Sequence, residues 1–161
     1  MMNLEEQIVL ELQQRNQTLT TAESCTGGLL AGRILNVSGA SAVYNEGHIT
    51  YSNEAKERLL GVSHETLEQY GAVSKETAYE MAEGLKKVSS ADVAISVTGI
   101  AGPGGGSVEK PVGLVYIAVV GPNYQRVEKL PLNPNIPLTR ATIQQQAAEY
   151  ALHMLYDSLK P

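Results

Sequence analysis

The segment from Gln17 to Leu35 constrains the fold most, because it joins a strand-like run to a helix-like run through small residues. The strand-like part is Gln17–Ala22, the helix-like part is Leu29–Leu35, and Thr21-Ala-Glu-Ser-Cys-Thr-Gly-Gly28 spans the junction. Hydroxyl residues and two glycines at such a junction let backbone N–H groups converge on one point. That point suits a phosphate, a carboxylate or the oxyanion of an acyl-transfer reaction. We therefore expect a functional site at this junction.

The rest of the chain alternates between helical and strand-like patterns. Further helices are predicted at Leu4–Gln14, Ser52–Gly61, Ser63–Tyr70, from Ser74 through Leu85, and at Thr139–Leu159. Further strands are predicted at 42–51, Ala91–Thr98, Val112–Val120 and Gln125–Leu132, the last at an edge. The buried strands indicate parallel pairs, and the hairpin over residues 112–132 adds antiparallel ones. The pattern predicts one α/β domain over residues 1–161, a three-layer α/β/α sandwich with a mixed sheet.

Composition excludes several classes of protein. The net charge of −5 argues against a protein that binds duplex nucleic acid. No apolar run approaches the roughly 18 residues of a membrane helix. Glu5 and Glu6 stand where a signal peptide would be basic, and one cysteine excludes an intrachain disulfide. We expect a soluble, cytoplasmic protein. The eight Tyr, with no Trp or Phe, predict an aliphatic core.

The run Gly99–Gly106 follows the predicted buried strand Ala91–Thr98. It lacks the Gly-Lys-Ser/Thr of a P-loop, and Ser107 stands where the dinucleotide fingerprint needs a third Gly or Ala. The run is then either a flexible surface loop or an active-site loop that brings backbone close to a ligand. Its place after a buried strand favours the active-site loop.

Metal ligands and a histidine base are not evident. The three histidines share no metal-ligand spacing with each other or with Cys25, so no metal or other cofactor is predicted. A hydrolase without a histidine base can use a lysine whose pKa is lowered by burial. Tyr51-Ser-Asn-Glu-Ala-Lys56 offers such a lysine at a helix start. Spacing alone favours an ordinary solvated Lys56.

Five ordered blocks together resemble a known family. They are Ala22-Glu-Ser-Cys-Thr-Gly-Gly28, Thr50-Tyr-Ser-Asn-Glu-Ala-Lys56, Gly71-Ala-Val-Ser74, Gly99-Ile-Ala-Gly-Pro103 and Glu109-Lys-Pro-Val-Gly113. The chain is similar to the C-terminal domain of the CinA (competence/damage-inducible) proteins, from about Leu4 to Leu155. That domain also exists alone as a nicotinamide-nucleotide amidohydrolase.

The resemblance implies hydrolysis of the carboxamide of nicotinamide mononucleotide, in pyridine-nucleotide salvage and without a metal. It implies Ser24 as the nucleophile, Lys56 as the general base and Tyr51 as a proton-relay or orienting residue. Backbone N–H groups around Cys25–Gly27 would hold the oxyanion. The residues expected to bind substrate are Glu23, Cys25, Thr26, Gly27, Thr98, Gly99, Gly102 and Arg140. The implied partners are the small nucleotide and further copies of the chain.

Several alternatives stay open. Cys25 is a rival nucleophile, although a lone Cys beside glycines is more often a packing residue. Relatives usually carry a second Arg one helical turn after Arg140, where this chain has Gln144. If those arginines hold the 5′-phosphate, this chain differs in preferred nucleotide or affinity. The runner-up function is a catalytically weak nucleotide-binding or regulatory module, and a third is hydrolysis of another small amide.

Overall fold

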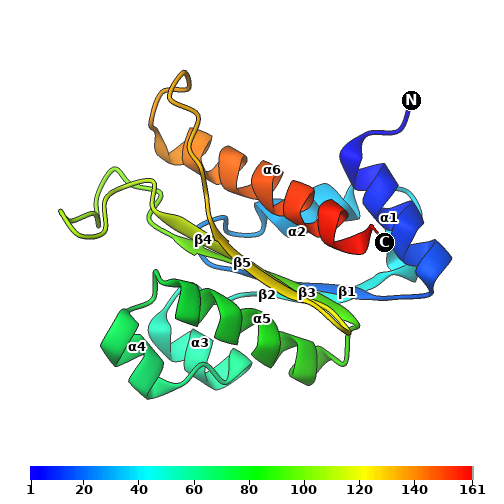
Figure 1. Cartoon of the computed structure of the whole chain (residues 1–161), viewed down its shortest axis with the longest axis horizontal. Coiled ribbons are helices and arrows are strands. Elements are labelled where there is room, and N and C mark those ends of the chain that lie inside the picture. Colours follow the sequence, from blue (N-terminus) through cyan, green and yellow to red (C-terminus); the bar gives the residue numbers. More distant parts are fainter. Residues whose placement is uncertain (161) are drawn as a thin grey trace.

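The computed structural model describes residues 1–160 and contains one five-stranded mixed sheet (Figure 1). The strands lie in the order β2-β1-β3-β4-β5, in which β2, β1 and β3 are parallel and β4 and β5 are antiparallel additions. This arrangement confirms the predicted α/β class, the mixed sheet and the edge position of the last strand. The strands are β1 (Leu19–Glu23), β2 (Tyr44–Ile49), β3 (Val93–Gly99), β4 (Val115–Val120) and β5 (Gln125–Lys129).

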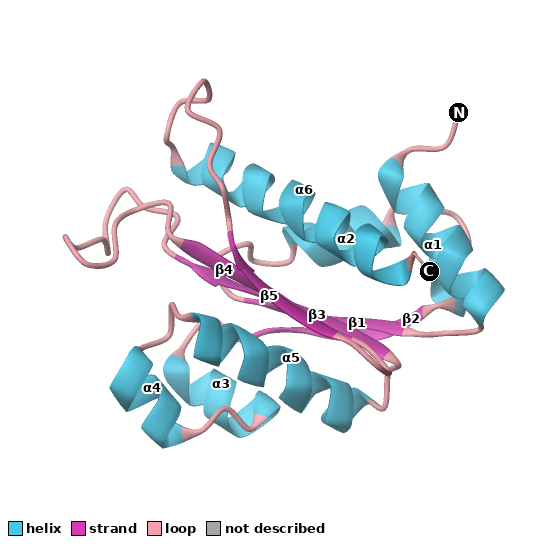
Figure 2. Ribbon diagram, viewed as in Figure 1, coloured by secondary structure: helices cyan, strands magenta, loops and turns pink. Residues whose placement is uncertain are grey.

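Helices cover both faces of the sheet, which confirms the three-layer sandwich (Figure 2). On one face lie α1 (Leu4–Arg15), α2 (Leu29–Leu35) and α6 (Arg140–Leu159). On the other lie α3 (Asn53–Leu60), α4 (His64–Tyr70) and α5 (Lys75–Ser89). A short 3-10 helix at Ala40–Ala42 precedes β2. No helix within residues 1–160 is long and apolar enough to cross a membrane.

Capping residues fix the helix starts where the sequence predicts them. The Ser52 side chain accepts a hydrogen bond from the Ala55 amide at 3.0 Å, and Thr139 caps α6 in the same way. Gly61 ends α3 with a φ of +69°, a left-handed conformation that glycine adopts without strain. Local chemistry therefore sets these helix ends.

Most strand boundaries differ from the prediction by one or two residues, and two differ by three. The strand β4 begins at Val115 rather than Val112, because the Leu114 amide donates to the Pro111 carbonyl at 3.1 Å and closes a turn. The strand β5 ends at Lys129 rather than Leu132, just before Pro131, which has no N–H for a ladder. Apolar residues continue beyond both strand ends, at Val112 and Leu114 before β4 and at Leu130 and Leu132 after β5, although Pro131 is a signal that β5 stops.

Small residues bring α5 close to the sheet and to α3. Ala78 and Ala82 of α5 pack on Ala94 and Ala118 of the central strands. A Cβ atom added at Gly84 would lie 1.7 Å from the Leu60 carbonyl oxygen at the end of α3. Close packing at this glycine therefore sets the position of α3 on its face of the sheet.

Candidate active site

The parallel strands place three functional segments at one edge of the sheet. Carboxyl ends of parallel strands share an edge, and ligands bind beyond them in open α/β sheets. Ser24 follows β1, Tyr51 follows β2 closely, and Gly99 ends β3. The structure therefore brings together the segments that the sequence predicts to form the site.

The turn that carries Ser24 is held by backbone hydrogen bonds. The Ser24 amide donates to the Val97 carbonyl at 3.0 Å, and the Gly27 amide donates to the Ser24 carbonyl at 3.2 Å. Gly27 and Gly28 have φ values of +58° and +101°, which residues with a Cβ atom rarely adopt. The two glycines thus allow the chain to pass directly from β1 into α2.

The buried side chain of Glu23 stabilises this turn. Its carboxylate is fully buried and accepts hydrogen bonds from the Thr26 hydroxyl at 2.6 Å and from the Leu30 and Ala31 amides at 2.9 Å. A carboxylate at a helix N-terminus satisfies free N–H groups and complements the helix dipole. The side chains of Glu23 and Thr26 shape the turn, and neither they nor Gly27 line the cavity beside Ser24. The structure thus gives no support to a substrate contact for these two side chains, or for Gly27, whose N–H is used within the turn.

Lys56 reaches Ser24 from the layer of α3, α4 and α5, whereas the helix that follows Ser24, α2, lies on the other face of the sheet (Figure 1). It lies in the first turn of α3, and its side chain is only 1% exposed. Its Nζ atom is 3.1 Å from Ser24 Oγ, 2.8 Å from the Thr50 carbonyl oxygen and 3.3 Å from the Tyr51 carbonyl oxygen. The spacing in the sequence favoured a solvated lysine, and the fold instead buries it against the serine.

Burial changes the protonation of Lys56. Loss of solvent around the ammonium lowers the Lys56 pKa from 10.5 to about 8. A neutral amine has two N–H groups and one lone pair. If the two carbonyls accept the N–H groups, the lone pair is left to accept the Ser24 hydroxyl proton. The contacts of Lys56 therefore suit a general base for Ser24.

Cys25 is poorly placed to be the nucleophile. Its side chain belongs to the apolar cluster between the sheet and the layer of α2 and α6, and it is 4% exposed. Burial raises the Cys25 pKa to about 12, so the thiol is neutral at physiological pH. Thiolates, not thiols, attack carbonyl carbons. Between the two candidates, the structure favours Ser24.

A cavity of about 260 Å³ lies beside Ser24 and Lys56. It contains eight of the eleven predicted site residues: Ser24, Cys25, Tyr51, Lys56, Thr98, Gly99, Gly102 and Arg140. It also contains six residues that were not named individually as site residues: Ala72, Val73, Ile100, Ala101, Gly104 and Gly105. The last four lie in the glycine run that was predicted to be an active-site loop, and Ala72 and Val73 lie in a block that carried the family resemblance, which is the only sequence signal for these two.

Thr98 presents only acceptor positions to the cavity. Its Oγ1 donates its proton to the Ala72 carbonyl at 2.8 Å. A hydroxyl has one proton and two lone pairs, so the lone pairs of Thr98 remain for a ligand. A group with N–H donors, such as a carboxamide, matches this arrangement.

Arg140 joins the mouth of the cavity to the glycine loop. Its guanidinium donates to the Gly102 carbonyl at 2.6 Å and to the Tyr51 hydroxyl at 3.3 Å. Tyr51 is 67% exposed, and it contacts Lys56 through its backbone carbonyl rather than its hydroxyl. This geometry fits an orienting role for Tyr51 better than direct proton transfer to Lys56.

Gln144 is a site residue that sequence reasoning treated only as a missing arginine. It lies one turn after Arg140 on α6, and its Nε2 donates to the Cys25 carbonyl at 2.8 Å. The contact links α6 to the residue directly after Ser24. The spacing of four residues from Arg140 was the signal, and it does not reveal that the partner is a backbone carbonyl.

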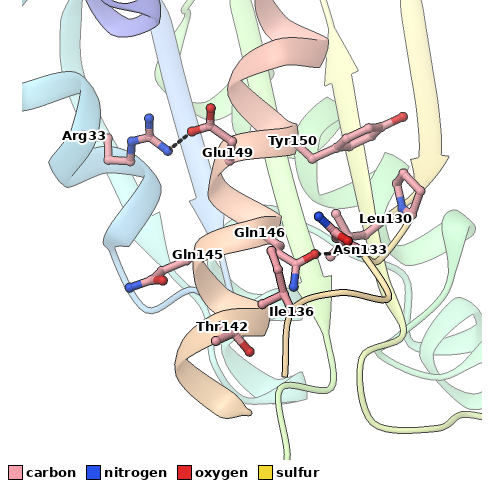
Figure 3. A pocket seen from close by; sticks show the side chains of 10 residues that line it. Arg33, Leu130, Asn133, Ile136, Thr142, Gln145, Gln146, Glu149 and Tyr150 are labelled. Atoms are coloured by element: carbon pink, nitrogen blue, oxygen red, sulfur yellow. Dashed lines mark hydrogen bonds and ion pairs between the residues drawn. The ribbon is translucent and has the colours of Figure 1, made fainter. Parts of the chain in front are cut away.

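A larger pocket of about 420 Å³ lies elsewhere on α6 and contains none of the predicted site residues (Figure 3). Its lining includes the ion pair between Arg33 and Glu149 and the contact from the Asn133 amide to the Gln146 side chain. It offers no nucleophile beside a base. Among residues 1–160 there is also no cluster of three or more His, Cys, Asp or Glu side chains that could hold a metal ion.

Comparison with known proteins agrees with this architecture. The family model of the CinA C-terminal domain matches residues 1–159. A CinA-like protein of Kosmotoga olearia is 50% identical over 159 residues, covering 99% of this chain and 38% of that protein. The chain thus spans little more than a third of the length of that curated relative.

Solved structures show the same fold. Competence/damage inducible protein CihA from Agrobacterium tumefaciens superposes with a TM-score of 0.91 at 43% identity, covering 97% of this chain and 93% of the other. A CinA superfamily protein from Klebsiella pneumoniae superposes with a TM-score of 0.90 at 34% identity, covering 97% and 95%. With the family model matching nearly every residue and the fold shared throughout, the chain belongs to the CinA C-terminal domain family.

Proposed function

We propose that this chain hydrolyses the carboxamide of nicotinamide mononucleotide, giving nicotinic acid mononucleotide and ammonia. One observation carries the proposal: Lys56 Nζ lies 3.1 Å from Ser24 Oγ in a buried site, with a pKa lowered to about 8. A serine beside a largely buried amine is the arrangement that acyl-transfer chemistry needs when no histidine is present.

In the first half of the reaction, Ser24 Oγ attacks the carboxamide carbon while its proton passes to Lys56 Nζ. The carbonyl oxygen becomes an oxyanion, for which backbone N–H groups after Ser24 are the available donors. The intermediate collapses by breaking the C–N bond, and Lys56 gives its proton to the departing nitrogen. Ammonia leaves, and the nicotinoyl group is held as an ester on Ser24.

In the second half, water attacks the ester carbon and gives a proton to Lys56. Collapse of the second tetrahedral intermediate breaks the bond to Oγ, and the proton returns to Ser24. The product acid releases its remaining proton to solvent and becomes a carboxylate, and the enzyme regains its starting state. Lys56 thus acts first as base and then as acid in each half, which requires a pKa near the working pH.

Two residues that line the cavity, Thr98 and Arg140, support a nucleotide amide as substrate. The free lone pairs of Thr98 can accept from the carboxamide NH₂, a contact that a carboxylate product cannot make. Arg140 is an exposed guanidinium at the mouth of the cavity, where it can bind the 5′-phosphate of a nucleotide. Substrate amide and phosphate would then be recognised by different residues of one cavity.

Ammonia release from nicotinamide mononucleotide tests the proposal directly. We expect turnover by the wild type and a loss of at least about 10³-fold in Ser24→Ala and Lys56→Ala. Cys25→Ala should keep kcat within about 10-fold, because a neutral buried thiol takes no part in the chemistry. Full turnover by Ser24→Ala would reject the mechanism. Binding of the nucleotide without ammonia release would favour the runner-up function, a binding module.

A further inference from the structure

We infer that Gln144 is a positioning residue for the oxyanion site, holding the peptide between Cys25 and Thr26 so that its N–H faces the reacting carbonyl. The inference rests on the proposed acyl-transfer function. It assigns to Gln144 a role different from binding substrate phosphate.

Two successive backbone N–H groups after the proposed nucleophile, within residues 1–160, are not bonded to another residue. Within residues 1–160, neither the Cys25 N–H nor the Thr26 N–H donates a hydrogen bond to another residue. Both residues are buried, and unpaired buried N–H groups are rare in native proteins. Two such donors beside a nucleophilic serine are the elements of an oxyanion hole.

Each of the two peptide groups needs its own restraint. The C=O and N–H of a trans peptide point in opposite directions, so fixing the carbonyl also fixes the N–H. The peptide that carries the Cys25 N–H is held through the Ser24 carbonyl, which accepts from the Gly27 amide at 3.2 Å. The peptide that carries the Thr26 N–H is held through the Cys25 carbonyl, which accepts from Gln144 Nε2 at 2.8 Å.

The two restraints differ in origin. The first is part of the turn itself, whereas the second comes from α6, which lies 119 residues further along the chain. Without Gln144, the Cys25 carbonyl would be free to rotate, and the Thr26 N–H would rotate with it. The orientation of one of the two oxyanion donors thus depends on a single amide side chain.

Steady-state kinetics with nicotinamide mononucleotide and four variants test this role. Gln144→Ala should lower kcat by about 10-fold or more, towards the 10²–10³-fold loss typical of a missing oxyanion donor, with KM within about 3-fold. Gln144→Glu, which keeps the shape but not the N–H donor, should lose at least as much. Gln144→Arg keeps N–H donors and should restore most of kcat. Gln145→Ala, an exposed neighbour of the same type, is the control and should match the wild type.

A boronic acid provides a readout that does not depend on turnover. The Ser24 adduct of 3-pyridinylboronic acid places a tetrahedral oxygen in the oxyanion site, whereas nicotinamide itself stays planar. The Gln144→Ala variant should bind the boronic acid about 10-fold more weakly than the wild type does, and its affinity for nicotinamide should be unchanged. No binding to the wild type, or equal binding to Gln144→Ala, would overturn the inference. So would a rise in KM at unchanged kcat, which is the signature of lost phosphate binding.

The two proposals fail in different ways. A wild type that binds the boronic acid but releases no ammonia rejects the proposed substrate and leaves the Gln144 comparison readable from the boronic acid. A wild type that releases ammonia, with Gln144→Ala equal to Gln145→Ala, rejects only the role of Gln144.

Discussion

Replacing Lys56 by Met should stabilise the folded protein at neutral pH, although it removes the proposed base. Lys56 is 1% exposed, and burial lowers its pKa from 10.5 to about 8. A shift of that size means that the ammonium destabilises the folded state by about 3 kcal/mol at pH 7. Met has a similar length and no charge, so the substitution removes the destabilisation caused by the buried ammonium.

The sign of the effect depends on pH. Because the folded pKa lies below the unfolded one, the destabilisation is complete below about pH 8 and disappears as pH rises towards 10.5. It falls to about 2 kcal/mol at pH 9 and below about 1 kcal/mol at pH 10. Met also removes the hydrogen bonds to the Thr50 and Tyr51 carbonyls, a loss of about 1–2 kcal/mol at any pH. The net effect is a gain of about 1–2 kcal/mol at pH 7 that vanishes or reverses near pH 10.

Urea unfolding of both proteins at pH 7, 8, 9 and 10 measures this difference. Lys75→Met is the matched control, because Lys75 is an exposed lysine at the start of α5 and its replacement removes no buried charge. Equal stability differences for Lys56→Met at pH 7 and pH 10 would refute the lowered pKa. A variant less stable than the wild type by several kcal/mol at pH 7 would refute the claim that the buried charge is destabilising.

Three further predictions concern the same site and its support. Between pH 7 and 9, kcat/KM for nicotinamide mononucleotide should rise about 10-fold and then level off, because the proposed mechanism needs Lys56 neutral. The substrate phosphate titrates near pH 6, outside this window, so a flat profile would contradict the lysine base. Thr98→Val should lower kcat/KM by about 10–100-fold by removing the acceptor for the carboxamide, whereas Thr98→Ser, which keeps the hydroxyl, should stay close to the wild type. Gly84→Ala should destabilise the protein by about 1–3 kcal/mol, since its Cβ would lie 1.7 Å from the Leu60 carbonyl. Gly32→Ala in α2, with nothing within 4 Å, is the control and should be neutral or slightly stabilising in urea unfolding.

The fold could be predicted from the sequence because its signals are local. Caps such as Ser52 and Thr139 and the stop at Gly61 act through neighbouring atoms, and each helix begins or ends where these residues stand. The start of β4 was missed, because a turn closed by a backbone hydrogen bond between Pro111 and Leu114 displaces it. Val112 and Leu114 made the apolar run look nearly continuous, although Gly113 between them, with a φ of +95°, is the residue that such a turn favours.

The site was predicted in part, and the gaps have a common cause. Ser24, Lys56 and Thr98 were named as site residues through the family resemblance and line one cavity, but the spacing did not show whether Lys56 reaches Ser24. Glu23 was assigned to substrate, whereas its carboxylate caps α2 from within the protein. The direction in which a side chain points across layers is a tertiary property, and no single segment encodes it.

The contributors to the site come from both layers of helices as well as from the sheet. The helices α3 and α6 lie on opposite faces of the sheet (Figure 1). Lys56 of α3 contacts Ser24, and Gln144 of α6 contacts the carbonyl of Cys25, the next residue after Ser24. Ser24, Lys56 and Gln144 come from segments that are far apart in the sequence, so no single segment supplies all of them. Catalytic competence should therefore be gained only when both helical layers have docked, and it should be lost in the same cooperative transition as the tertiary structure. In this domain, activity would be a measure of complete folding.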